Sequence, residues 1–147
     1  MTTRLCIGPL LWALAILTAT LAGCARPAGP PPIAAGTECA TCAMEASSPR
    51  FACERQVGKS WRVYDSIECL MRDAGPAVAT TMWLPDYDER ALHRADSLWI
   101  VKGDLATPMA GGLVAFRSRA AADSVAASSH GRVGRWTDLA SAVESAP

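Results

Sequence analysis

The pattern of hydrophobic and polar residues becomes regular from Phe51 onward. Two short runs rich in aromatic and β-branched residues, separated by Gly58-Lys59-Ser60, predict a β-hairpin. Asp65 or Ser66 is then placed to N-cap a short helix, which Gly75-Pro76 would end. For this first half the pattern predicts strands over 51–57, 61–67 and 78–84 and a helix over 68–73.

The second half repeats this order of elements. Ser118 is placed to cap an alanine-rich helix, and His130-Gly131 is typical of a helix end, which gives His130 a structural role. The pattern predicts strands over 98–102 and 113–116, a short strand or turn over 133–136, and helices over 118–129 and 138–144. Tyr64-Asp65-Ser66 and Phe116-Arg117-Ser118 occupy corresponding corners of the two halves.

This repetition predicts the fold class. We expect an α+β protein built from two similar ββαβ units, with helices packed on small mixed or antiparallel sheets. The units would span about 50–90 and 95–140, within one domain over 37–147.

The N-terminal residues 1–23 have the pattern of a signal peptide, with Arg4 ahead of an apolar run over 10–17. They end in Leu21-Ala22-Gly23-Cys24, which resembles the lipobox of bacterial lipoproteins. This resemblance implies that Cys24 becomes the first residue of the mature chain and carries acyl chains such as palmitate. Because no Asp follows Cys24, it also implies a periplasmic lipoprotein of the outer membrane rather than the inner one. An uncleaved membrane anchor is the alternative.

Residues 24–36 contain four prolines and two glycines and predict an extended tether. The charges balance, with Lys+Arg 14 against Asp+Glu 14, and no basic run indicates binding to nucleic acid. With two histidines, a His-rich metal site is not expected. We place His93 in a solvated polar loop, and Asp86, Asp88 and Glu89 in a solvated surface turn.

The sequence contains none of the common motifs of hydrolytic enzymes. There is no Gly-x-Ser-x-Gly elbow, no HExxH and no glycine-rich phosphate loop, so we do not expect an enzyme.

Apart from Cys6 in the leader and Cys24, four thiols remain: Cys39, Cys42, Cys53 and Cys69. In an extracytoplasmic chain these could form two disulfides in any of three connectivities.

The sulfur chemistry is concentrated in Cys39-Ala40-Thr41-Cys42-Ala43-Met44. Thiolates suit Zn²⁺ as well as copper, whereas thiolate together with thioether favours Cu(I). Met71 and Met109 add two further thioethers, and Met109 is the contribution that the second half could make. Cys69 lies in the first turn of a predicted helix, where the helix dipole would lower the pKa of its thiol. A small buried hydrophobic role for Cys69 is the alternative.

Two other functions of the cysteines remain as alternatives. Cys39 and Cys42 form the Cys-x-x-Cys motif of thiol–disulfide oxidoreductases, although a proline-rich tether precedes it and no βαβ pattern follows. Cys39, Cys42, Cys53 and Cys69 have the right number for a structural zinc site, but the second Cys-x-x-Cys pair is missing.

Several motifs in order resemble the NosL family. They are the lipobox, Cys-x-x-Cys-x-Met, Tyr64-Asp65-Ser66-Ile67-Glu68-Cys69-Leu70-Met71, Trp83 with Asp86-Tyr87, and Thr107-Pro108-Met109 running to Phe116. The similarity extends from Cys24 to about Leu139. It implies two ββαβ halves related to part of organomercurial lyase. It also implies a periplasmic, lipid-anchored Cu(I) metallochaperone whose client is nitrous oxide reductase or its maturation machinery.

The resemblance also implies a ligand set. Cys39, Cys42 and Met44 match the family's Cys-x-x-Cys-Gly-Met, with Ala43 in place of glycine. Cys69 and Met71 match its Ile-Gly-Cys-Met region, from which Glu68 and Leu70 depart, and Met109 matches its Thr-Pro-Met loop. Cys53 has no counterpart, and it could pair with Cys69 in a disulfide across the first hairpin.

Overall fold

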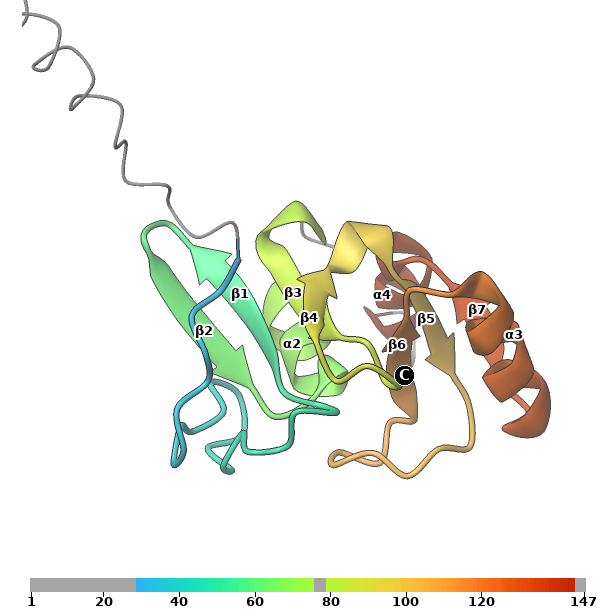
Figure 1. Ribbon diagram of the computed structural model, residues 1–147, viewed down its shortest axis with the longest axis horizontal. Coiled ribbons are helices and arrows are strands. Elements are labelled where there is room, and N and C mark those ends of the chain that lie inside the picture. Colours follow the sequence, from blue (N-terminus) through green and yellow to red (C-terminus); the bar gives the residue numbers. More distant parts are fainter. Residues whose placement is uncertain (1–28, 76–78, 145–147) are drawn as a thin grey trace, which may run out of the picture.

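In the computed structural model, the first half of the chain forms a four-stranded antiparallel sheet with one helix (Figure 1). The structure describes residues 29–75 and 79–144. The elements of this half are β1 (Cys53–Val57), β2 (Ser60–Tyr64), α2 (Ile67–Ala74), the 3₁₀ turn η2 (Ala79–Thr81), β3 (Met82–Pro85) and β4 (Leu92–Arg94). The strand order is β2-β1-β3-β4, so the predicted hairpin occupies one side of the sheet. Ser66 caps α2 by accepting a hydrogen bond from the Cys69 N–H at 3.3 Å.

The second half forms a three-stranded antiparallel sheet in the order β6-β5-β7. Its elements are the 3₁₀ turn η3 (Ala95–Ser97), β5 (Trp99–Lys102), β6 (Leu113–Phe116), α3 (Arg119–Ser128), β7 (Arg132–Gly134) and α4 (Trp136–Glu144). In each half the third strand pairs antiparallel with the first, on the side away from the hairpin partner. This confirms the predicted α+β class with two similar ββαβ units.

Several predicted elements differ from the structure. The strand predicted over 78–84 is confined to β3, which follows the 3₁₀ turn η2, and the strand predicted over 61–67 ends at Tyr64, because Ile67 begins α2. His93 does not lie in a loop, because it belongs to strand β4, where it pairs with Leu84 and where its Nε2 lies 3.2 Å from Glu89 Oε2. Helix α4 begins at Trp136 rather than at residue 138. The Asp138 carboxylate accepts a hydrogen bond from the Arg135 N–H at 2.9 Å, which starts the helix before Trp136.

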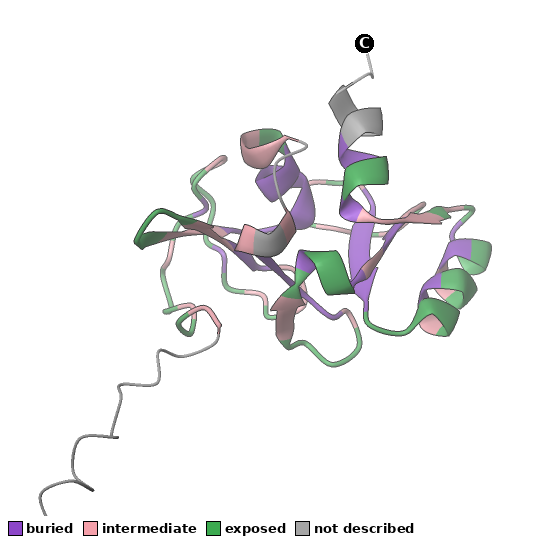
Figure 2. Ribbon diagram, turned by 90° about the horizontal axis from the view of Figure 1, so that it is seen from above, coloured by how far each residue is buried: buried purple, intermediate pink, exposed green. Residues whose placement is uncertain are grey.

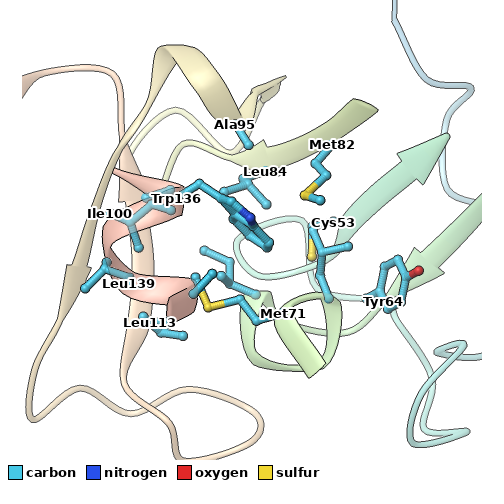
Figure 3. Packing of buried hydrophobic residues seen from close by; sticks show 14 of the residues in the cluster. Cys53, Tyr64, Met71, Met82, Leu84, Ala95, Ile100, Leu113, Trp136 and Leu139 are labelled. Carbon is cyan, nitrogen blue, oxygen red and sulfur yellow. The ribbon is translucent and has the colours of Figure 1, made fainter. Parts of the chain in front are cut away.

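The two halves share one hydrophobic core. Figure 3 shows Met71 of α2 and Trp136 of α4 meeting between the sheets, with Leu84 from the first half and Ile100 from the second. A smaller cluster lies between α3 and the outer face of the second sheet. Buried residues therefore run through the middle of the molecule and along the inner sides of the helices (Figure 2).

A buried carboxylate joins the halves at one corner. Asp86 is 4 % exposed and accepts hydrogen bonds from the N–H groups of Asp88, Glu89 and Arg117 at 2.9, 2.9 and 2.7 Å. Burial acts to raise the pKa of Asp86, but these N–H donors outweigh it and hold the pKa below its usual value. The prediction of a solvated turn was therefore wrong for Asp86, which links the end of β3 to the start of α3.

The predicted signal peptide and Cys24 lie outside the described residues. Within residues 29–75 and 79–144, no helix has the length and apolar content needed to cross a membrane.

Candidate metal-binding site

The Cys39–Met44 segment forms a closed loop. The Cys39 N–H donates to the Met44 carbonyl at 2.7 Å, and the Ala43 N–H donates back to the Cys39 carbonyl at 3.0 Å. Ala43 has a φ of 61°, a left-handed conformation that glycine adopts without cost and alanine adopts with strain. The loop therefore closes despite the alanine at this position.

This loop is held against the first helix of the domain. The Ala40 N–H donates to the Val63 carbonyl on β2 at 2.8 Å, and the Thr41 hydroxyl donates to the Cys69 carbonyl on α2 at 3.0 Å. The Thr41 N–H also points at Cys39 Sγ, at 3.5 Å. These contacts bring the Cys-x-x-Cys motif to the first turn of α2, which carries Cys69.

Four ligand atoms meet there. The sulfur atoms of Cys39, Cys42 and Cys69 and one carboxylate oxygen of Asp65 all lie within 4.8 Å of one another. Around a metal held at a bond length of about 2.3 Å, tetrahedral ligand atoms are roughly 3.8 Å apart. The side chains therefore need only a small adjustment to enclose one ion. Cys39, Asp65 and Cys69 are buried, and Cys42 is half-buried.

The electrostatic environment differs from the sequence-based expectation. Burial raises the pKa of the Cys69 thiol well above its ordinary value, and the nearby Asp65 carboxylate raises it further. The prediction that the helix N-terminus would lower this pKa was therefore wrong. Burial also raises the pKa of the Cys42 thiol. Since metal binds the thiolate, a metal ion that enters this site must displace protons.

Asp65 is the site residue that the sequence did not single out. Its carboxylate is 4 % exposed, and neither oxygen has a hydrogen-bond partner among the described residues. Asp65 and Ser66 were equal candidates for the helix cap. Because Ser66 takes that role, the Asp65 carboxylate remains available to the thiols.

Cys53 does not belong to the cluster. Its side chain is fully buried on β1, and its thiol donates to the Ser66 carbonyl at 3.2 Å. Burial raises the pKa of this thiol well above its ordinary value. Cys39, Cys42, Cys53 and Cys69 are all free, so the structure contains no Cys53–Cys69 disulfide. In the set of four candidate zinc ligands, Asp65 therefore takes the place of Cys53.

The three candidate methionines lie in different surroundings. Met44 is 46 % exposed at the end of the Cys39–Met44 loop, whereas Met71 is buried in the shared core. Met109 is half-buried and packs against the edge of that core, which includes Cys39 and Cys69.

The fold has a relative among solved structures. The structure of the copper chaperone NosL from Shewanella denitrificans superposes with a TM-score of 0.61, covering 75 % of this chain and 94 % of that chain. The two sequences are 16 % identical, so the likeness shows a shared fold. No family model matches the chain, and no curated protein matches it by sequence.

Proposed function

We propose that this protein is a Cu(I)-binding metallochaperone and not an enzyme. The observation that carries the proposal is the meeting of Cys39, Cys42 and Cys69 within 4.8 Å. Thiolate is a soft ligand that selects Cu(I), and three thiolates suit its low coordination number. A fold shared with a copper chaperone supports the same conclusion.

Release of copper would proceed by ligand exchange. Each thiol gives up its proton as it binds Cu(I), and an incoming sulfur ligand of the client replaces one protein sulfur at a time. Met44 and half-buried Cys42 are the accessible sulfurs from which exchange would start. Met109 would supply a thioether, which is a weaker ligand than thiolate and leaves the ion transferable.

The cellular setting follows from the N-terminal sequence. Cys24 would carry the lipid anchor, and residues 24–36 would tether the domain on the periplasmic side, at the outer membrane. The client would be nitrous oxide reductase, its maturation machinery or another copper enzyme. The resemblance to NosL supports this choice of client.

Zinc is the second candidate cargo, and Asp65 favours it. A carboxylate oxygen is a ligand for Zn²⁺ and a poor one for Cu(I), and three cysteines with one aspartate complete a tetrahedral set of zinc ligands.

Thiol–disulfide exchange fits the structure less well. The Cys42 pKa is raised, whereas a redox-active cysteine needs a lowered one.

A competition experiment tests the proposal. The reduced full chain is loaded with one equivalent of Cu(I) and titrated with a chromogenic Cu(I) chelator such as bathocuproine disulfonate. We expect the Cys39→Ser/Cys42→Ser double variant to bind Cu(I) on the order of 100-fold more weakly, because each ligand supplies a sizeable share of the binding free energy.

Cys53→Ala is the matched control, because it removes a buried thiol outside the cluster and should leave the affinity unchanged. Equal Cu(I) affinity of the wild type and the double variant would refute the copper proposal. A parallel titration with Zn²⁺ and Asp65→Asn decides between the cargoes. A zinc cargo predicts that Asp65→Asn lowers the Zn²⁺ affinity, because the carboxylate is then a ligand, whereas a copper cargo predicts that Asp65→Asn leaves both affinities unchanged.

A further inference from the structure

We infer that Glu68 is the positioning residue that holds the loop carrying Met109 against the core that contains Cys39 and Cys69. Glu68 is the second residue of α2, and it contacts the loop Thr107–Gly112 of the other half. The inference rests on the proposed Cu(I) function, and it explains how one site could draw sulfur from both halves. Glu68 is not one of the four residues of the cluster, and it acts through the loop.

The contacts between Glu68 and the loop are short and buried. Glu68 is 9 % exposed, and its Oε1 accepts hydrogen bonds from the Thr107 hydroxyl at 2.7 Å and from the Leu113 N–H at 3.1 Å. The Thr107 hydroxyl in turn accepts from the Gly112 N–H at 3.0 Å. One carboxylate therefore fixes both ends of the segment that has Met109 at its centre.

The loop is shaped to receive this carboxylate. The Ala110 N–H closes a turn onto the Thr107 carbonyl at 3.0 Å, and Ala110 has a φ of 54°. A Cβ at Gly111 would collide with Glu68 Cγ. The glycine thus permits a close approach of the loop backbone to the side chain, which a larger residue would prevent.

Helix α2 connects this contact to the metal site. Glu68 and Cys69 are neighbours in the first turn of α2, and Met109 packs against the core that contains Cys69 and Cys39. Outer-shell groups that orient a ligand typically change metal affinity 10- to 100-fold when removed.

The test compares four single variants and one double variant by Cu(I) competition on the reduced full chain. We expect Glu68→Ala, Thr107→Val and Met109→Leu each to lower the affinity about tenfold. Glu68→Gln keeps an acceptor oxygen and should restore most of the affinity. In the double variant Glu68→Ala/Met109→Leu, the affinity should be no lower than in Met109→Leu alone, because Glu68 acts through Met109.

Met82→Leu is the control for a buried methionine outside the site, and it should bind Cu(I) as the wild type does. Thr107→Val removes the hydrogen bond between the Thr107 hydroxyl and Glu68 without removing a charge. It therefore tests the positioning role of Glu68 even if Glu68→Ala fails to fold. The inference is overturned if Met109→Leu weakens binding while Thr107→Val does not. It is also overturned if Met109→Leu has no effect, or if Glu68→Ala weakens binding further in the Met109→Leu background. In each case the cysteine variants still decide the copper proposal separately.

Discussion

Glu54 is a buried acid with no neutralising partner. It lies on β1 with 1 % exposure, and neither carboxylate oxygen has a hydrogen-bond partner among the described residues. Cys53 and Arg55 face α2, so alternation places Glu54 on the opposite face of the sheet, beside its strand partner Trp83. Burial raises the pKa of Glu54 from 4.5 to about 7.

This shift makes stability depend on pH in a direction opposite to that of an ion-paired acid. The folded state holds the Glu54 proton more tightly than the unfolded state, so its contribution is full below about pH 4.5 and is lost as the pH rises to about 7. The loss is roughly 3 kcal/mol. Relative to wild type, Glu54→Gln should therefore gain about that much unfolding free energy between pH 5 and pH 8. Urea unfolding of the reduced proteins at both pH values measures it, and a difference that does not change with pH would contradict the burial account.

For single residues, the sequence predicted three of the thiols that the structure brings together, but not their environment. Cys39, Cys42 and Cys69 were selected by side-chain type, and the structure brings them together. The raised pKa of Cys69 could not be predicted, because it depends on burial and on Asp65, both consequences of tertiary packing. Asp65 itself was hidden by its second possible role as a helix cap.

The elements follow local chemistry where that chemistry is strong. Ser66 and Ser118 were both predicted to cap a helix. The side chain of each accepts a hydrogen bond from a backbone N–H of the first helical turn. The strand over 113–116 was predicted to the residue. Strand β4 was missed because it has three residues, of which only Leu92 is apolar, and because it is held by pairing to β3 rather than by its own pattern.

Asp86 links elements of the two halves at one corner of the molecule. Beside its three N–H donors, the neighbouring Tyr87 N–H donates to Ala115 on β6 at 2.8 Å. Asp86→Ala would leave three partly buried N–H groups without acceptors, at a cost of about 3 kcal/mol in unfolding free energy. Asp88→Ala, in the same turn but exposed, should change it by less than about 0.5 kcal/mol. Equal urea midpoints for the two variants would contradict this role.

On the scale of the whole molecule, the repeated ββαβ units supply different parts of the proposed site. The first unit and the loop before it contribute all the thiols, and the second contributes Met109. The duplication could be predicted because both units repeat the same order of hairpin, cap and helix. The contact through Glu68 could not, since it joins residues 39 positions apart whose proximity only the folded core creates.

The central claim is that Cys69 shares one Cu(I) ion with the Cys-x-x-Cys motif. Copper K-edge X-ray absorption of the one-to-one complex counts the sulfur atoms around the metal. We expect a shell of sulfur alone in the wild type and in Cys53→Ala, with one fewer sulfur in Cys69→Ser. A Cys69→Ser spectrum that superposes on that of the wild type, or a shell dominated by nitrogen and oxygen, would contradict it.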